Sequence, residues 1–236
     1  MDTHEKFGRR AFIAGSTRAI GLLAAMSHAF ASDADASPQV LGPVPRDATR
    51  LRRLLDAMDA KGGQYWSVPR QDGEFLSFLV KAVRAKSALE VGTSHGFSAI
   101  WMGIALEETG GRLTTIEIDA ARHDLARRNV AEAGLSQRIT LIKADAHLEA
   151  VKLPGPFDFV FLDADKEGQV DYFHKLYPKK LLPGGLLAVH NAIRQAASMR
   201  DYLDLVRRHP DFDTVTVSAT MDDGFCLSYR RRQAER

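Results

Sequence analysis

Several residues that could do chemistry stand directly after apolar runs in this chain. The first group is the segment Glu90-Val91-Gly92, which ends the apolar run 88–91 and is followed by Gly96 and by a helical pattern that begins at Ser98. A strand, a glycine turn and a helix in this order form the place at which open α/β sheets bind nucleotide-like ligands. Glycine lets a ligand approach the main chain, and the helix start offers free N–H groups. We therefore expect this turn to bind a ligand.

The spacing of the turn differs from the dinucleotide-binding fingerprint G-x-G-x-x-G. Ser94 stands where that fingerprint has its second glycine, and Phe97 stands at the third. Fewer glycines suggest a ligand without a pyrophosphate, and the carboxylate of Glu90 suits a cationic group. Glu117, near the end of the next apolar run, could accept hydrogen bonds from ribose hydroxyls. A ribose-bearing ligand with a positive centre and no diphosphate points to S-adenosylmethionine; a structural turn with a surface acid is the alternative.

A second polar group follows two later apolar runs. Asp163 comes directly after the run 157–162, and His190 and Asn191 close the run 186–190. Because the carboxyl ends of neighbouring parallel strands meet at one edge of a sheet, these side chains could converge on one point. Carboxylate, amide and imidazole groups together suit a divalent cation. Two interpretations without a metal stay open: Asp163 and, more readily, Asp165 could cap a helix, and His190 could be a strand-end histidine whose hydrogen bonds are satisfied.

The hydrophobic pattern predicts the elements that position these residues. Strands are expected at 88–91, 113–118, 139–143, 157–162, 186–190, 214–218 and 225–229. Helices are expected at 46–60, 71–86, 98–108, 120–133, 146–151, 168–177 and 195–208. Strands that alternate with helices form a parallel sheet covered on both faces, and the last two strands form a hairpin. We predict an α/β fold with a Rossmann-like, doubly wound, seven-stranded sheet that is mostly parallel and ends in an antiparallel hairpin.

The segment from about Gln71 to Asn191 resembles the small cation-dependent O-methyltransferases of the catechol and caffeoyl-CoA type, which are class I methyltransferases. The resemblance rests on the glycine turn, on Glu117, on Asp145-Ala146 and on the run Phe161-Leu162-Asp163-Ala164-Asp165-Lys166. It implies an enzyme that transfers a methyl group from S-adenosylmethionine to a hydroxyl of a small, catechol-like substrate.

The resemblance also implies roles for individual residues. The cofactor would be bound by Glu90, Gly92, Ser98, Glu117, Asp145, Ala146 and Asp163. A Mg-like cation would be bound by Asp163 and Asn191, and Lys166 matches the family's candidate general base.

His190 is the place where the chain departs from the family, which has an aspartate before the asparagine. Imidazole in place of a carboxylate shifts the expected metal set of Asp163, His190 and Asn191 from Mg toward Mn, Fe or Zn. Two other outcomes stay open. His190 could act as the general base without a metal, or catalysis could be lost.

The start of the chain resembles a twin-arginine export signal. Arg9-Arg10 precede an apolar run at 19–26 and the small-residue site Ala29-Phe30-Ala31. We predict a signal peptide at 1–31, a linker at 32–45, a methyltransferase domain at 46–230 and a basic tail at 231–236. The mature protein would be periplasmic or secreted, and a cytoplasmic protein with an amphipathic tail is the alternative. The apolar run is shorter than the about 20 residues of a stable membrane span.

Composition limits the partners. Of 32 basic and 30 acidic residues, the segment 1–31 contains four and two, which leaves 28 of each sign and argues against a nucleic-acid partner. The single cysteine, Cys226, excludes an internal disulfide. We expect a small hydroxylated molecule as the partner, and the resemblance suggests a homodimer. A non-catalytic exported binding protein is the competing function, and a nicotinamide dehydrogenase is disfavoured by Ser94 and Phe97.

Overall fold

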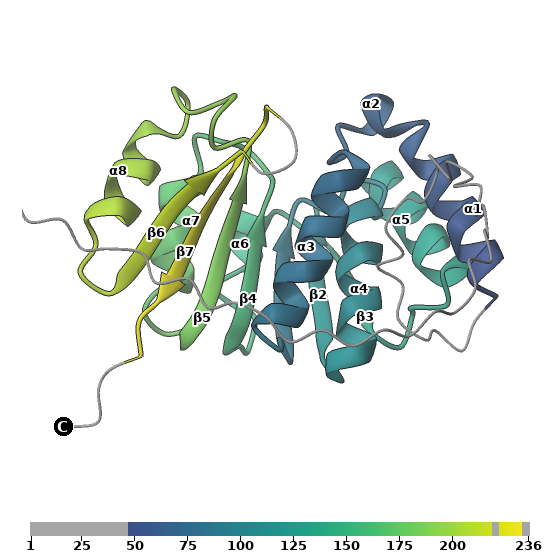
Figure 1. The fold of residues 1–236 in the computed structure, drawn as a ribbon, viewed down its shortest axis with the longest axis horizontal. Helices are drawn as coiled ribbons and strands as arrows, with labels where there is room; N and C mark the ends of the chain where they lie inside the picture. Colours follow the sequence, from purple (N-terminus) through teal and green to yellow (C-terminus); the bar gives the residue numbers. More distant parts are fainter. Residues whose placement is uncertain (1–46, 219–221, 233–236) are drawn as a thin grey trace, which may run out of the picture. The chain divides into compact units, whose positions relative to one another are not determined.

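The computed structural model of the protein describes residues 47–218 and 222–232, and the structural statements below concern these residues (Figure 1). The predicted signal peptide 1–31, the linker 32–45 and most of the tail 231–236 lie outside them, so these assignments stay predictions. Within the described residues, no helix has the length and apolar character needed to cross a membrane.

A seven-stranded sheet with the order β3-β2-β1-β4-β5-β7-β6 forms the centre of the fold (Figure 1). The strands are β1 Ser87–Val91, β2 Arg112–Glu117, β3 Ile139–Lys143, β4 Phe157–Leu162, β5 Leu181–His190, β6 Phe212–Val217 and β7 Phe225–Arg230. Strands β1 to β5 run parallel, whereas β7 pairs antiparallel with both β5 and β6. The predicted α/β fold with a closing hairpin is confirmed, and the strand order reverses between β1 and β4, where such sheets bind ligands.

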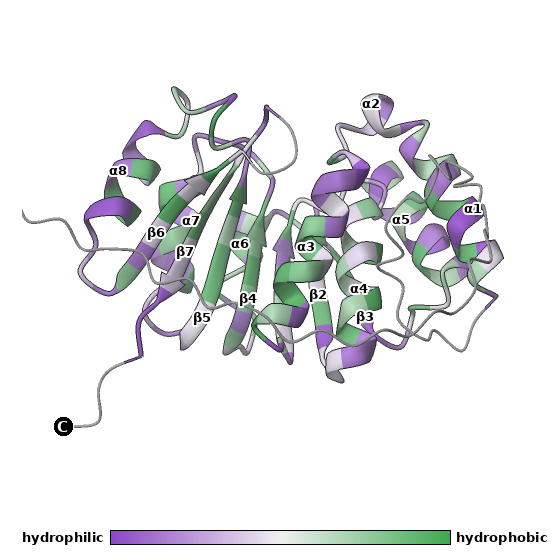
Figure 2. Ribbon diagram, viewed as in Figure 1, coloured by the Kyte–Doolittle hydropathy of each residue, from purple (hydrophilic) through white to green (hydrophobic). Residues whose placement is uncertain are grey.

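Helices cover both faces of this sheet. They are α1 Ala48–Asp59, α2 Gly62–Tyr65, α3 Arg70–Ala82, α4 Phe97–Thr109, α5 Ala120–Glu132, α6 Ala146–Glu149, α7 Gln169–Leu176 and α8 Arg200–Arg208. One apolar core joins α1, α3, α4 and α5 to the sheet, and a second core joins α6, α7 and α8 to it. Figure 2 shows the hydrophobic residues along the strands, with hydrophilic residues on much of α8.

Helix α4 is apolar on all sides because α3 covers the side that a surface helix would expose. Its residues from Phe97 to Leu106 are all buried, as expected for a helix without a polar face. Gly73 of α3 makes this packing possible, since a Cβ there would lie 2.2 Å from the Trp101 ring. The two helices therefore fix each other's position beside the carboxyl end of the sheet.

Several predicted boundaries are wrong. Strand β5 begins at Leu181 and not at 186, because Leu181 pairs with Phe157 across an irregularity in the register. Helix α8 begins at Arg200 and not at 195. The segment before it forms turns, and the N–H groups of Ile193 and Arg194 bond to the carbonyl of Asp223. The turn between β6 and β7 thus holds the segment that follows β5.

Candidate active site

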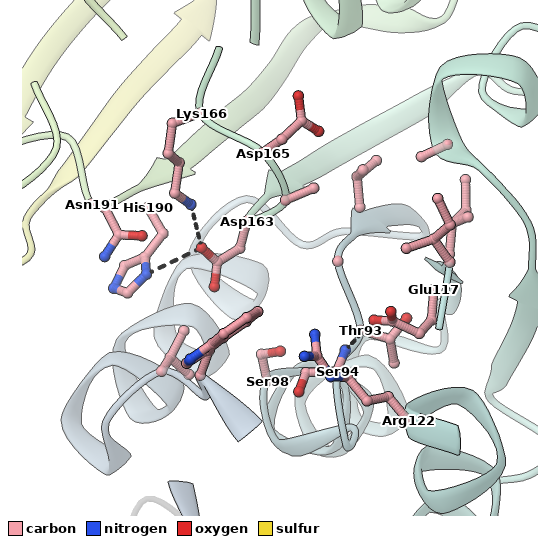
Figure 3. A pocket seen from close by; sticks show the side chains of 18 of the residues that line it. Thr93, Ser94, Ser98, Glu117, Arg122, Asp163, Asp165, Lys166, His190 and Asn191 are labelled. Carbon is pink, nitrogen blue, oxygen red and sulfur yellow. Dashed lines mark hydrogen bonds and ion pairs between the residues drawn. The ribbon is translucent and has the colours of Figure 1, made fainter. Parts of the chain in front are cut away.

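A cavity of about 1010 Å³ opens at the carboxyl ends of β1, β2, β4 and β5 (Figure 3). The predicted site residues that line it are Gly92, Ser98, Glu117, Asp145, Ala146, Asp163, Lys166, His190 and Asn191. Glu90 does not line it. The fold therefore brings both polar groups of the sequence to one cavity, while the role of each residue stays a prediction.

Gly92 lies where the two polar groups of the cavity approach each other. Its φ of 97° lies in the region that favours glycine, and a Cβ at this position would lie 2.5 Å from the carbonyl oxygen of Asp163. The turn after β1 therefore passes close to the backbone at the end of β4. A larger residue would push the glycine turn away from Asp163.

Glu90 lies beneath the glycine turn and is fully buried. One carboxylate oxygen accepts a hydrogen bond from the Ser98 hydroxyl, and the other accepts one from the Thr115 hydroxyl at 2.6 Å. Burial raises the pKa of Glu90 to about 7, although both hydrogen bonds act in the opposite direction. Because Ser98 lines the cavity and Glu90 does not, Glu90 can act on a ligand through the Ser98 hydroxyl.

Glu117 ends β2 with both carboxylate oxygens held by the main chain. One oxygen accepts the N–H of Ser94 at 2.7 Å, and the other accepts the N–H of Asp119 at 2.9 Å. The first of these bonds is drawn in Figure 3. Each oxygen keeps a free lone pair, so the carboxylate is preset to accept hydroxyl groups from the cavity.

Asp145 and Ala146 form the start of α6 at the same cavity. The Asp145 carboxylate caps the helix by accepting the N–H of His147 at 2.8 Å. Ala146 is buried and lines the wall. A methyl side chain next to a capped helix start offers a flat, mostly apolar surface.

Asp163 is the centre of the second polar group (Figure 3). Its Oδ1 accepts a hydrogen bond from Lys166 Nζ at 2.7 Å, and His190 Nδ1 lies 3.4 Å from the same oxygen. Burial acts to raise the pKa of Asp163, but the charges of His190 and Lys166 outweigh it and hold that pKa below its ordinary value. One carboxylate therefore faces two basic groups.

Asp165 takes no part in this group. Its side chain accepts the hydroxyl of Tyr172 at 2.8 Å and lies beside His147, and Figure 3 shows it turned away from Asp163. The residue that caps the following helix is Gly168, so the helix-capping interpretation is wrong for both Asp163 and Asp165.

His190 lies between two acids. Its Nε2 is 2.8 Å from Asp72 Oδ2, while its Nδ1 faces Asp163. Burial acts to lower the pKa of His190, but Asp163 and Asp72 together raise it to about 9. The imidazole is therefore protonated at neutral pH unless a metal ion binds to the ring nitrogen in place of the proton.

Asp72 had no assigned role in the sequence analysis. It is fully buried, and its Oδ1 has no hydrogen-bond partner among the described residues. A signal was present, because Asp72 stands one turn before Leu76 on the apolar stripe that continues through Leu79 and Val80. An acid on a buried helix face needs a partner, and here the partner comes from β5.

Two atoms of the expected donor set have a separation that suits ligands of one small divalent cation. Ligands about 2.1 Å from a metal lie roughly 3.4 Å apart at a tetrahedral angle, and Asp163 Oδ1 and His190 Nδ1 have this separation. The Asn191 side chain lies beside them in Figure 3. Ligand atoms of Asp72, His190 and Asp223 also lie within 4.8 Å of one another. A nitrogen ligand disfavours Mg relative to Mn, Fe or Zn, and the imidazole must lose a proton before it can bind any of them.

The fold and the cavity at the strand reversal define a class I methyltransferase. A family model described as O-methyltransferase matches residues 45–219, so the chain belongs to the O-methyltransferase family. Its enzymes use S-adenosylmethionine as the methyl donor, and this chain is a transferase of that type.

Individual relatives and solved structures to which the chain is similar are also O-methyltransferases. The chain is 33% identical over 200 residues to a catechol O-methyltransferase from Mycobacterium tuberculosis, a match that covers 78% of this chain and 90% of the relative. It is 35% identical over 154 residues to a putative caffeoyl-CoA O-methyltransferase from Arabidopsis thaliana, with 63% and 66% covered. The solved O-methyltransferase from Bacillus cereus in complex with SAH is 28% identical with a TM-score of 0.68, and 80% of this chain and 93% of that chain are covered.

Proposed function

We propose that this enzyme methylates one hydroxyl of a small aromatic molecule that carries two neighbouring hydroxyls, as a catechol does. The observation that carries the proposal is the position of Asp163, Lys166, His190 and Asn191, which line the same cavity as the glycine turn. The names of the similar proteins, which include catechol O-methyltransferases, also support it.

The cofactor would lie along the glycine turn. Ser98, with Glu90 behind it, suits the amino-acid end, because a hydroxyl held by a buried carboxylate can accept from an ammonium group. Glu117 suits the ribose hydroxyls, since its two oxygens are already oriented by main-chain N–H groups. Asp145 and Ala146 suit the adenine. The methyl group would then face Asp163 and Lys166.

Methyl transfer forms a bond between the substrate oxygen and the methyl carbon while the carbon–sulfur bond breaks and its electron pair stays on sulfur. The proton of the hydroxyl must leave before or during this step. A bound divalent cation would lower the pKa of the substrate hydroxyls. The hydroxyl proton would pass to Lys166 Nζ, which donates to Asp163 at 2.7 Å and must first release a proton of its own to solvent. The cavity walls would hold the two reactants in line.

Methyl transfer by the full chain to a panel of vicinal diols and matched mono-hydroxylated compounds tests the proposal. We expect product only from compounds with two neighbouring hydroxyls. Calorimetry with S-adenosylmethionine is run beside it. If the cofactor binds and the mono-hydroxylated compounds react equally well, the proposed substrate class is wrong.

His190→Asp tests the metal ion. Wild type and variant are compared with added Mg, with added Mn and with EDTA. We expect the variant to gain Mg dependence, because the carboxylate restores a hard oxygen ligand. Identical responses of both proteins would show that His190 is not the altered cation ligand.

The competing hypothesis of a non-catalytic binding protein finds no support in the comparisons, which point to O-methyltransferases throughout. Export of the mature protein remains a proposal based on Arg9-Arg10 and the segment that follows. Cell fractionation of the full chain and of a variant with both arginines changed to lysine tests it. Equal distribution of the two proteins between compartments would contradict export by this route.

A further inference from the structure

Asp72 is a buried carboxylate that cannot touch a substrate. Its side chain is 0% exposed, and it does not line the cavity. Burying a carboxylate is costly unless it is paired and hydrogen-bonded. The polar contact that the structure gives it is His190 Nε2 at 2.8 Å, from a residue 118 positions away in the sequence.

The position of this carboxylate is fixed by helix packing. Asp72 lies in the first turn of α3, next to Gly73, where the helix approaches α4 so closely that a Cβ would meet the Trp101 ring. Leu76 and Val80 on the same face are fully buried in the core. The backbone of Asp72 therefore has little room to shift.

The orientation of the His190 ring follows from that contact. A carboxylate oxygen accepts but does not donate, so the ring presents Nε2–H to Asp72 and, while it is protonated, Nδ1–H to Asp163. When the ring loses one proton, Asp72 keeps the proton on Nε2. The ring also packs against Phe225, at 5.0 Å between centroids, and lies near Phe161. These aromatic rings offer no replacement acceptor, so a turned ring would leave the Asp72 carboxylate buried without its partner.

We infer that Asp72 is a positioning residue that holds His190 with Nε2–H toward α3 and with Nδ1 toward the reacting end of the cavity. The description of this end of the cavity as the reacting end rests on the proposed function, whereas the orientation of the His190 ring does not depend on it. A carboxylate behind a histidine fixes its tautomer and strengthens the opposite nitrogen as a ligand or base. In this chain the imidazole of His190 faces the cavity, and the carboxylate of Asp72 lies behind it.

Two variants separate the parts of this role. Asp72→Asn keeps an oxygen that accepts from Nε2–H but removes the charge, whereas Asp72→Leu removes both. Loss of a carboxylate behind a metal-binding histidine lowers activity or metal affinity by about 10–100-fold. We expect kcat to fall by roughly tenfold in the asparagine variant and by roughly 100-fold in the leucine variant. The KM for S-adenosylmethionine should stay within about twofold in both, because the Asp72 carboxylate contacts His190 and does not line the cavity.

Asp158→Asn is the matched control. Asp158 also accepts two hydrogen bonds, from the N–H groups of Lys86 at 2.7 Å and Ser87 at 3.0 Å, but it lies at the opposite end of β4. This variant reports what loss of a structural carboxylate costs without touching the cavity. We expect its kcat and its histidine spectrum to match those of wild type.

Nitrogen-15 NMR of the histidine ring gives a readout that needs no activity. Spectra are recorded above about pH 9, where the His190 ring is neutral. We expect one set of His190 ring signals with Nε2–H in wild type and in Asp72→Asn, and exchange between tautomers in Asp72→Leu. The asparagine change is also made in His190→Asn, where it should cost no further loss of kcat. An unchanged His190 spectrum in the leucine variant, or an equal loss of kcat without His190, would overturn the inference.

The NMR result separates this inference from the proposed function. If wild type transfers no methyl group to a vicinal diol but the leucine variant shows the tautomer exchange, the substrate proposal fails and the inference holds. If Asp72 is instead a direct ligand of a metal shared with His190 and Asp223, Mn binding measured by calorimetry will be lost equally in both Asp72 variants and in Asp223→Asn. That result would also overturn the positioning role.

Discussion

The two ends of the active-site cavity hold their carboxylates in different ways. At the glycine turn, Glu90 and Glu117 accept hydrogen bonds from hydroxyls and main-chain N–H groups, all of them neutral donors. At the other end, Asp163 and Asp72 face the basic side chains of Lys166 and His190. The first end is suited to binding a cationic ligand, whereas the second contains positively charged side chains of its own.

The difference follows from how each end is assembled. The donors to Glu90 and Glu117 lie on β2, on α4 and in the loops directly after β1 and β2. The reacting end combines α3, the end of β4 and the end of β5. Loss of one neutral donor removes one hydrogen bond, whereas loss of one partner from a cluster of paired charges leaves an uncompensated buried charge.

Asp163→Asn should have the largest effect, since it removes the acid shared by Lys166 and His190. Loss of one group that is oriented toward the reacting atoms typically costs about 100–1000-fold in kcat, and loss of one partner of a buried pair costs about 3 kcal/mol of stability. Steady-state kinetics and chemical denaturation measure both. The control is Asp165→Asn, whose side chain pairs with Tyr172 and should leave kcat within about threefold. Equal losses in the two variants would contradict the proposed centre at Asp163.

The glycine-turn end predicts a pH dependence of stability. The pKa of Glu90 is raised by burial from 4.5 to about 7, so the folded state keeps a proton that the unfolded chain releases over this range. Stability from this group is complete below about pH 4.5 and is lost as the pH rises through about 7, by roughly 3 kcal/mol. Denaturation of wild type and of Glu90→Gln at pH 5 and pH 8.5 measures the difference. The glutamine variant should lack this component, and equal pH dependence in both proteins would contradict it.

The sequence predicts the two ends unequally, and the reason is the distance along the chain. Gly92, Ser98 and Glu117 belong to a strand–turn–helix pattern that is readable from hydrophobic periodicity alone, and the fold follows from the same pattern. Asp72 and His190 lie on a helix and a strand that come together only in the folded protein. An acid on the apolar stripe of α3 was visible, but the sequence contains no indication of which residue would pair with it.

Glu117→Gln should weaken cofactor binding and leave the chemical step intact. A glutamine has one accepting oxygen in place of two, so the N–H of either Ser94 or Asp119 loses its acceptor, and the side chain loses its fixed orientation as well as its charge. A hydrogen bond to a charged group contributes about 1.5–3 kcal/mol, which corresponds to roughly 10–100-fold in Kd. Calorimetry measures this loss, and kcat at saturating cofactor should change little. A large fall in kcat with unchanged Kd would show that the two ends are not separate.

Trp66→Ala should have the smallest effect and tests whether the segment between α2 and α3 covers the cofactor. The Trp66 ring is 77% exposed, lines the cavity and carries the Arg122 guanidinium at 4.5 Å from its centroid. A cation–π contact at an exposed site contributes about 0.5–1 kcal/mol, and here it helps to hold Arg122 at the cavity wall. We therefore expect the Kd for S-adenosylmethionine to rise by no more than roughly two- to fivefold. Phe78→Ala removes an aromatic residue that is exposed but lies outside the cavity, and it should leave the Kd unchanged. The carbonyl of Tyr65, next to Trp66, accepts a hydrogen bond from the Ser94 hydroxyl of the glycine turn, so loss of Trp66 should act on cofactor affinity and not on kcat. That result would extend the separation of the two ends to the segment between α2 and α3.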